Sequence, residues 1–349
     1  MHARPARNKV AAVVIVFLVT AVLLAGLELT ARVLTHFRIL RAWQPIQMVW
    51  NEGTEDYRMA HLTLDRYREP DPLLFWRPVP TPPYNAQRFK GSLMVVPKPP
   101  DVFRIMCYGD SNTDGYDRGS WPEQLEKLLN ERSTGSHRYE VVNAGVVGYS
   151  SHQGLLRFRG EVERYRPNMV IVSFGWNDAA DIGGRRPDSE YQLSAWRVTF
   201  LRVVLRSRLF LVFMHYFGDR RVAPPHVHAA RVPLVDYLRN MKSFADTASQ
   251  HGASVVYLTR PHREQEAKLR LLEYWERDVA LYNARLRLWA DEQALPLIDI
   301  QKLFAISGRE WFADKSHFTL PGHRLMAKTL LMHLAQRRLI PGITTAIRQ

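Results

Sequence analysis

Apolar residues fill one long run near the N-terminus of the chain. From Val10 to Leu27 it reads VAAVVIVFLVTAVLLAGL, in which Thr20 is the only clearly polar residue. As a helix this run would span about 27 Å, close to the hydrocarbon thickness of a bilayer. The pattern predicts a basic tail at residues 1–9 and a transmembrane anchor at residues 10–30. A cleaved signal peptide is the alternative, but the run is long for such a leader and no A-x-A cleavage site follows it.

The charges that flank this helix are nearly balanced. Three basic residues precede the run and three follow it: Arg4, Arg7 and Lys9, then Arg32, Arg38 and Arg41. Because a short basic tail stays on the cytoplasmic side, we expect the long C-terminal part to be exported. The predicted location is a single pass through the cell (inner) membrane with an extracytoplasmic, periplasmic domain.

Proline dominates the segment that follows the anchor. Nine of the chain's 21 prolines lie between Pro70 and Pro100. Because proline fixes φ and lacks an N–H donor, this stretch is expected to be extended chain on or beside the next domain. Residues 31–100 are therefore interpreted as a juxtamembrane, proline-rich spacer.

From residue 101 to 340, short apolar runs alternate with helical periodicity. The expected strands are Val102–Tyr108, Tyr139–Asn143, Met169–Phe174, Ser254–Leu258 and Leu297–Ile300. The expected helices are Trp121–Leu129, Gln153–Tyr165, Val235–Gln250, Glu264–Glu292 and Pro321–Arg337. Strands that alternate with helices predict an α/β fold, a three-layer α/β/α sandwich around a five-stranded parallel sheet.

One insertion, residues 191–232, interrupts this alternation. It carries seven arginines against the single Asp219, a net charge of +6, interleaved with aromatic residues. Two interpretations stay open beside that of an ordinary helix with solvated arginines. The segment either contacts an anionic membrane surface or covers the active site. Its apolar run Leu209–Phe217 is too short to span a bilayer.

Composition and charge exclude several functional classes. The chain has 48 Lys+Arg against 34 Asp+Glu, a formal charge of +14. Its arginines are spread along the chain and match no nucleic-acid module, so no nucleic-acid partner is predicted. The single cysteine, Cys107, excludes an intramolecular disulfide framework and a cysteine-based zinc cluster.

Three polar turns follow predicted strands, where open parallel sheets place their ligands. The first, GDSNT at 109–113, presents the hydroxyl of Ser111 on a tight strand-to-helix turn. The second, NAGVVGYS at 143–150, contains Gly145, whose bare N–H is able to approach a substrate oxygen. In the third, GWND at 175–178, the amide of Asn177 is a further donor. Each of these turns alone also fits an ordinary loop or helix cap.

A fourth polar cluster, DKSH at 314–317, lies near the C-terminus. Its spacing allows one turn to hold both side chains, so that Asp314 orients the His317 ring toward Ser111. Asp299 is a rival acid partner, and His323 is expected to pack in a helix. His226 and His228 are too isolated to predict a metal site, so neither a metal nor a cofactor is expected.

Together, these motifs resemble those of the SGNH (GDSL-type) hydrolase family, in its bacterial membrane-anchored form. The resemblance covers roughly residues 101–340, and residues 1–100 carry no comparable motif. It implies a flavodoxin-like sheet and a serine esterase mechanism. The roles it implies are Ser111 as nucleophile, His317 as base, Asp314 as its partner, and Ser111, Gly145 and Asn177 as oxyanion-hole donors. Asn112 stands where many members have Leu or Phe, a variation expected to touch no catalytic role.

The predicted function is a serine esterase or acylhydrolase that cleaves an acyl ester through a covalent acyl-enzyme. The alternative is an O-acyltransferase or O-deacetylase that acts on a cell-envelope polysaccharide or lipid, because both reactions share the acyl-enzyme. A non-catalytic, membrane-tethered binding module with the same fold is the third hypothesis.

Overall fold

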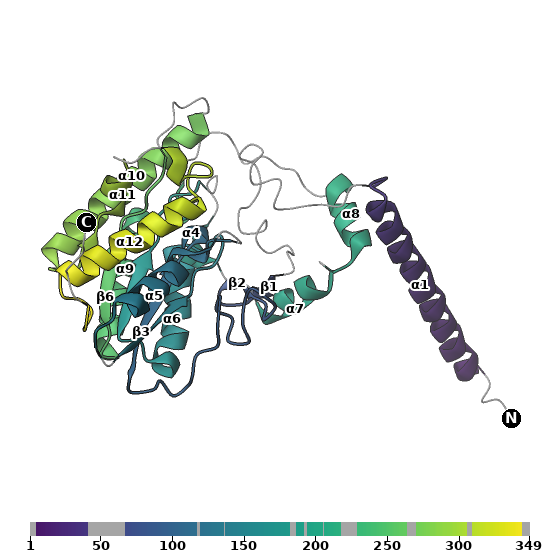
Figure 1. The fold of residues 1–349 in the computed structure, drawn as a ribbon. Helices are drawn as coiled ribbons and strands as arrows, with labels where there is room; N and C mark the ends of the chain where they lie inside the picture. The colour runs from purple at the N-terminus through teal and green to yellow at the C-terminus, as the bar shows by residue number, and fades with distance from the viewer. Residues whose placement is uncertain are drawn as a thin grey trace. The chain divides into compact units, whose positions relative to one another are not determined.

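The computed structural model divides the chain into two compact units (Figure 1). It describes residues 5–40, 67–116, 119–135, 137–181, 186–191, 194–204, 206–217, 229–263, 270–305 and 309–343. One unit comprises Met1–Leu64 and Ser194–Val222 and is called the anchor unit after the anchor that the sequence predicts in it. The other comprises Asp65–Leu193 and Ala223–Gln349 and is called the catalytic unit after the catalytic residues that the sequence predicts in it. The sequence-predicted insertion is thus largely grouped with the N-terminal helix.

The anchor unit is built on α1, which runs from Pro5 to His36. Within it, Ala11–His36 is long and apolar enough to cross a membrane, and none of its most apolar window is buried. A signal sequence near an N-terminus satisfies the same criteria, so both sequence-based interpretations of the run agree with this helix. The unit also contains the helices α7 (Ala195–Val204) and α8 (Arg208–Phe217).

A five-stranded parallel sheet forms the centre of the catalytic unit, as the sequence predicts. Its strands lie in the order β4-β3-β5-β6-β7. Their bounds are Val102–Gly109 for β3, Arg138–Asn143 for β4, Met169–Ser173 for β5, Ser254–Leu258 for β6 and Leu297–Ile298 for β7. The β3 strand pairs with β4 on one side and β5 on the other, so the turn after β3 lies at the carboxyl edge of the sheet between two neighbouring strands.

Helices cover both faces of this sheet and make the three layers. The bounds are α5 Trp121–Arg132, α6 Ser151–Tyr165, α9 Leu234–Gln250, α10 Arg270–Glu292, α11 Ile300–Ala305 and α12 Leu320–Gln336. Apolar side chains of α5 and α12 share one buried core with β3 and β5. On the other face, Phe158 of α6 stacks on Phe244 of α9 with ring centroids 5.4 Å apart. The single-turn elements are α4 Ser111–Asp114 and the 3₁₀ turns η1 Asp188–Glu190 and η2 Arg309–Trp311.

The proline-rich segment differs from the extended spacer expected for it. It contains an antiparallel hairpin of β1 (Arg68–Asp71) and β2 (Phe75–Pro78). Trp76 is fully buried, and its indole Nε1 donates to the carbonyl of Val147 at 3.2 Å. Strands of four residues that each contain a proline carry too little alternation to be predicted from the sequence, yet the aromatic side chains give the hairpin a core.

Candidate active site

Ser111 stands at the start of α4, on the turn that follows the interior strand β3. Asp110 caps this turn, because its Oδ1 accepts the N–H of Asn112 at 2.9 Å. The Ser111 side chain is largely buried, with 5% of its surface exposed. At the first helical position the backbone N–H has no carbonyl to bond within the helix, and in the described part of the chain it has no other acceptor.

His317 and Asp314 meet this serine, although they lie about two hundred residues further along the chain. The Ser111 Oγ is 2.8 Å from His317 Nε2, and His317 Nδ1 is 2.7 Å from Asp314 Oδ2. The three groups form a continuous hydroxyl–imidazole–carboxylate relay of contacts, a geometry in which a carboxylate is able to orient the ring and the ring to accept a hydroxyl proton. The structure thus brings together three side chains that the sequence motifs single out.

The short loop from Asp314 to His317 is stabilised by hydrogen bonds within the loop. Asp314 Oδ1 accepts the backbone N–H groups of Ser316 at 2.9 Å and of His317 at 2.8 Å. Burial disfavours the ionised carboxyl, but the hydrogen bond and charge of His317 and these two N–H donors outweigh it. The pKa of Asp314 is consequently lowered from 3.8 to about 2, so the group is ionised at neutral pH.

Asn112 joins the serine turn to the histidine loop. Its Nδ2 donates to the Ser316 carbonyl at 2.7 Å, and its Oδ1 accepts the Phe318 N–H at 3.0 Å. Both bonds flank His317, so the side chain holds the backbone on either side of this residue. The sequence alone does not predict this contact, and whether Asn112 influences catalysis stays a prediction. A Leu or Phe at this position would offer neither hydrogen bond.

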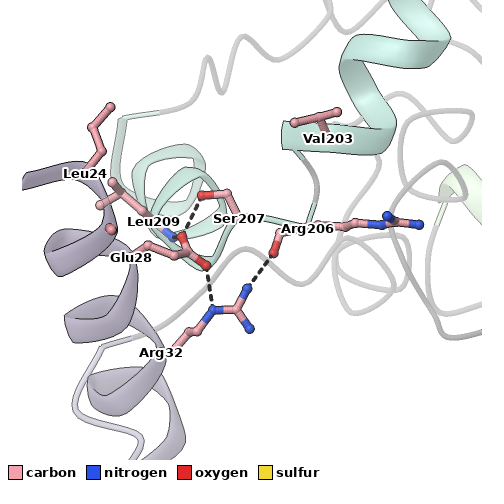
Figure 2. Close-up of a pocket in the computed structure, with 8 residues that line it drawn as sticks. Leu24, Glu28, Arg32, Val203, Arg206, Ser207 and Leu209 are labelled. Atoms are coloured by element: carbon pink, nitrogen blue, oxygen red, sulfur yellow. Dashed lines mark hydrogen bonds and ion pairs between the residues drawn. The ribbon is translucent and has the colours of Figure 1, made fainter. Parts of the chain in front are cut away.

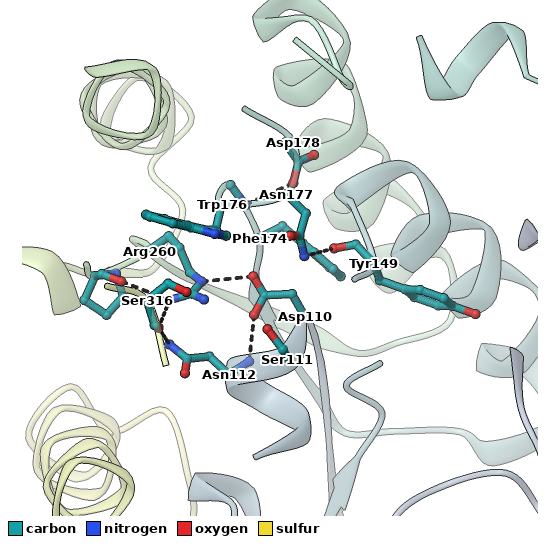
Figure 3. A network of polar contacts seen from close by, with 12 residues as sticks. Asp110, Ser111, Asn112, Tyr149, Phe174, Trp176, Asn177, Asp178, Arg260 and Ser316 are labelled. Atoms are coloured by element: carbon teal, nitrogen blue, oxygen red, sulfur yellow. Dashed lines mark hydrogen bonds and ion pairs between the residues drawn. The ribbon is translucent and has the colours of Figure 1, made fainter. Parts of the chain in front are cut away.

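Arg260, which no sequence motif indicates, connects the same two segments and lies between Asp110 and Ser316 (Figure 3). It follows β6, is fully buried, and donates from Nε to Asp110 Oδ2 at 3.0 Å. Its Nη1 donates to the carbonyls of Pro261 at 2.9 Å and Ser316 at 3.2 Å. One guanidinium therefore contacts both the cap of the serine turn and the loop that carries His317. From the sequence this arginine is indistinguishable from any other loop arginine.

The Asn177 amide lies across the site from this network, on the turn after β5 (Figure 3). Its Nδ2 donates to the Tyr149 carbonyl at 3.0 Å, which orients an amide that carries two N–H donors. The next residue, Asp178, holds the turn, because it accepts the N–H groups of Ser151 at 2.9 Å and Gly175 at 3.0 Å. Burial raises the pKa of Asp178 to about 7.

Gly145 does not present its N–H to the site as the sequence analysis expects. The N–H donates to Asn143 Oδ1 at 3.0 Å, and a Cβ on this residue would lie 2.4 Å from the backbone nitrogen of Asp114. Close packing of two turns therefore accounts for the glycine. Gly148, in the same segment, has a positive φ of 82°, and its N–H has no acceptor among the residues that the structure describes.

Tyr116 packs against the ring of His317. Its ring meets that of His317 edge-on, with centroids 5.3 Å apart and an interplanar angle of 73°. Burial, the largest influence, raises the pKa of Tyr116 to about 12, so the phenol stays neutral. Sequence reasoning missed this residue, because it lies beyond the recognisable motif and contacts His317 only through the fold.

The other acid and histidine residues considered in the sequence analysis do not join this site in the described part of the chain. The carboxylate of Asp299 accepts Arg287 Nε at 2.7 Å and Thr259 Oγ1 at 2.8 Å. His323 is buried in α12 with its ring edge-on to Phe318. His226 and His228 lie outside the described residues. Within the described residues, no group of three or more His, Cys, Asp or Glu side chains is arranged to hold a metal ion.

Comparison with known proteins gives a family match over most of the catalytic unit. Residues 107–325 match the model of the GDSL-like Lipase/Acylhydrolase family. A stretch of 77 residues is 34% identical to thioesterase 1/protease 1/lysophospholipase L1 of Escherichia coli, covering 21% of this chain and 34% of that protein. Another of 87 residues is 31% identical to an uncharacterized lipoprotein of Bacillus subtilis, covering 24% of this chain and 35% of that protein. The matches thus span about a third of these relatives' length.

Two solved structures align with this chain at low sequence identity. A lipase/acylhydrolase from Enterococcus faecalis aligns with 17% identity and a TM-score of 0.43, covering 67% of this chain and 96% of that one. The acetyl xylan esterase AlAXEase aligns with 16% identity and a TM-score of 0.45, covering 65% of this chain and 97% of that one.

Proposed function

Because the chain belongs to the GDSL-like lipase/acylhydrolase family, we propose that it is a serine esterase in which Ser111, His317 and Asp314 form the catalytic triad. The observation that carries this proposal is the unbroken relay, 2.8 Å from Ser111 Oγ to His317 Nε2 and 2.7 Å from His317 Nδ1 to Asp314 Oδ2.

Acylation begins when Ser111 Oγ attacks the carbonyl carbon of the ester. His317 Nε2 accepts the hydroxyl proton and then delivers it to the leaving alcohol or thiol. The ionised Asp314 keeps the second proton of the ring on Nδ1 and stabilises the imidazolium that forms. Water, activated by the same histidine, then releases the acyl group from Ser111.

Negative charge on the carbonyl oxygen requires donors already in place. We assign this role to the backbone N–H of Ser111 and to the Asn177 amide, whose orientation is set by the Tyr149 carbonyl. In place of Gly145, we assign the third donor to Gly148, which directly precedes Tyr149 and whose N–H has no acceptor in the described residues. Loss of one such donor typically slows the reaction about 100- to 1000-fold.

Hydrolysis of p-nitrophenyl esters from acetyl to long acyl chains tests the proposal. With the full chain in detergent, we expect turnover that falls about 1000-fold or more in Ser111→Ala. Turnover that survives in Ser111→Ala would refute the assignment of the nucleophile. Asn177→Ala should lower kcat while a fluorophosphonate still labels Ser111.

The same experiment separates hydrolysis from acyl transfer. A transferase would be labelled at Ser111 by the fluorophosphonate yet turn over esters efficiently only with an added sugar or lipid acceptor. A chain that neither hydrolyses esters nor reacts with the probe would fit the non-catalytic binding module instead.

We further propose that α1 anchors the enzyme in the inner membrane as a single span, with the catalytic unit on the extracytoplasmic side. The basic tail, the exposed apolar surface of α1 and the similarity to a lipoprotein support this placement. Its substrate is then an acyl ester of the cell envelope, on a glycan or a lipid. A reporter fused after Gln349 that is active only in the cytoplasm would refute this orientation.

A further inference from the structure

A carboxylate on α1 holds the start of α8 within the anchor unit (Figure 2). Glu28 directly follows the uncharged run that ends at Leu27. Its Oε2 accepts Ser207 Oγ at 2.7 Å and the Leu209 N–H at 3.0 Å, and its Oε1 accepts the Arg208 N–H at 3.0 Å. Glu28 therefore caps a helix that lies about 180 residues away in the sequence, using donors that the helix itself leaves unsatisfied.

Arg32, one turn further along α1, completes the junction. Its Nε donates to Glu28 Oε1 at 2.7 Å, and its Nη2 donates to the Arg206 carbonyl at 3.2 Å (Figure 2). The ion pair neutralises the carboxylate and fixes the chain between α7 and α8. Apolar side chains from both partners lie beside these polar contacts, namely Leu24 and Ala25 of α1 with Val203 and Leu209.

The position of this junction on α1 fixes its level in a membrane. The uncharged run before Glu28 is about 27 Å long, enough to cross the hydrocarbon core once. Glu28 and Arg32 then lie where that core gives way to the headgroups. Because they hold the N-terminus of α8, this helix begins at the same level.

The remaining surface of α7 and α8 is rich in aromatic and basic residues. Large apolar side chains are exposed on both helices: Trp196, Phe200, Val203, Phe213, Tyr216 and Phe217. Arg197, Arg206 and Arg208 are exposed among them. Trp, Tyr and Arg are the residues that suit the boundary between lipid and water, because one end is apolar and the other reaches polar headgroups.

We infer that α7 and α8 form an interfacial membrane arm, which lies in the headgroup region of the leaflet in which α1 ends. At ten residues, α8 is about 15 Å long and too short to cross the bilayer, so it lies in the interface. The phenylalanines enter the acyl boundary and the arginines bind lipid phosphates. The inference rests on the proposed membrane anchor and is independent of the catalytic assignments.

Depth-dependent fluorescence quenching tests the arm in the full chain reconstituted into phospholipid nanodiscs. The variant Phe213→Cys is labelled with an environment-sensitive NBD dye, while the native Cys107 stays unlabelled because it is buried. Val235→Cys is the matched control, an exposed apolar position on α9 of the catalytic unit. We expect a blue shift and quenching by doxyl-labelled lipid at position 213 and neither effect at position 235.

Dyes at two further positions distinguish failure of the membrane anchor from failure of the arm. A dye at Leu18→Cys, in the middle of the uncharged run, reports whether α1 is inserted, and Phe200→Cys gives a second position on the arm. Quenching at 18 without quenching at 213 and 200 would overturn the arm while the anchor stands. No quenching at 18 would remove the anchor and the arm with it. A third outcome is that dyes at 213 and 200 are not quenched by the lipid but change their fluorescence when a fluorophosphonate reacts with Ser111. This result would identify an active-site lid and overturn the proposal.

A separate variant tests the junction between α1 and α8. Glu28→Ala removes the cap of α8, so in the Phe213→Cys background we expect weaker quenching by lipid and a red-shifted dye. Unchanged quenching at 213 would contradict the part of the inference that assigns the arm's depth to Glu28.

Discussion

Asn112 and Asn130 make the same kind of contact in two different places. Asn112 bonds the carbonyl of Ser316 and the N–H of Phe318, and Asn130 bonds both the N–H and the carbonyl of Tyr139, each at 2.9 Å. Each asparagine therefore bonds two backbone groups of another segment, about two hundred residues away for Asn112 and nine residues away for Asn130. Only the segment held by Asn112 carries the proposed base.

This matched pair separates stability from catalysis. We expect Asn112→Ala and Asn130→Ala each to lower the free energy of unfolding by about 1–3 kcal/mol, because each leaves backbone groups unsatisfied. Only Asn112→Ala should also lower kcat, by about 10- to 100-fold, because His317 loses its alignment with Ser111. Urea unfolding and ester hydrolysis of both variants are the measurements. Equal kcat values in the two would contradict a positioning role for Asn112.

Asp314 should make stability depend on pH in the acid range. Its pKa is lowered from 3.8 to about 2 in the folded chain, so folding favours the ionised form. This contribution is fully present above about pH 4 and is lost as the pH falls toward 2. Because 39% of the side chain is exposed, solvent screening keeps the effect small.

The test is urea unfolding of the wild type and Asp314→Asn between pH 6 and pH 2.5. The wild type is expected to be more stable at pH 6, and the difference should shrink as the pH falls. A difference that stays constant over this range would show that the charge of Asp314 does not contribute.

At the scale of elements, the sequence predicts the sheet and most helices but not the side-chain contacts that connect one element to another. Each strand is built mainly of apolar residues, and each helix has its own periodicity, so local pattern suffices. The serine is recognisable because it lies in a short motif after β3, and the aspartate and histidine because they lie together in a short motif before α12. Arg260 and Tyr116 act through contacts between distant segments, which leave no trace in local pattern. The sequence suggests an oxyanion-hole role for Gly145 that its contacts do not support, because close packing and ligand binding both favour a glycine.

Arg260 connects the end of β6 with the cap of α4. Arg260→Met would leave the buried Asp110 carboxylate unpaired, and we expect it to cost about 3–5 kcal/mol of unfolding free energy. Adding Asp110→Asn removes the unpaired charge while its amide oxygen still caps Asn112, so the double variant should be more stable than Arg260→Met alone. Thermal and urea unfolding of the three variants measure this. A double variant less stable than Arg260→Met would contradict the ion-pair explanation.

The hairpin of β1 and β2 supports the segment that positions Asn177. Trp76 bonds the Val147 carbonyl, and the Tyr149 hydroxyl donates to the Trp76 carbonyl at 2.7 Å. Trp76→Ala is expected to destabilise the catalytic unit by about 3–5 kcal/mol, the cost of emptying a core site of this size. Leu73→Ala, at an exposed position between the two strands, is the control and should be close to neutral. Urea unfolding that gives equal values for both would refute a structural role for the hairpin.

At the scale of the whole molecule, the division into two units predicts separable properties. Deletion of residues 1–40 removes α1 but leaves every residue of the catalytic unit. We expect the shortened protein to be released from membranes by alkaline carbonate, which leaves the full chain in the pellet. Its kcat/KM for a soluble short-chain ester should be unchanged, because no triad residue lies in the deleted part. A loss of activity in a folded, soluble deletion variant would contradict this separation.

The distance along the chain between Ser111 and His317 also has a consequence for biogenesis. A ribosome makes Ser111 long before His317, and the Ser316 carbonyl, which accepts from both Asn112 and Arg260, is synthesised just before His317. Until this segment docks, the serine has neither its proposed proton acceptor nor the loop that would align it. If the proposed triad is correct, a nascent chain that stops short of His317 is therefore expected to be inert toward esters.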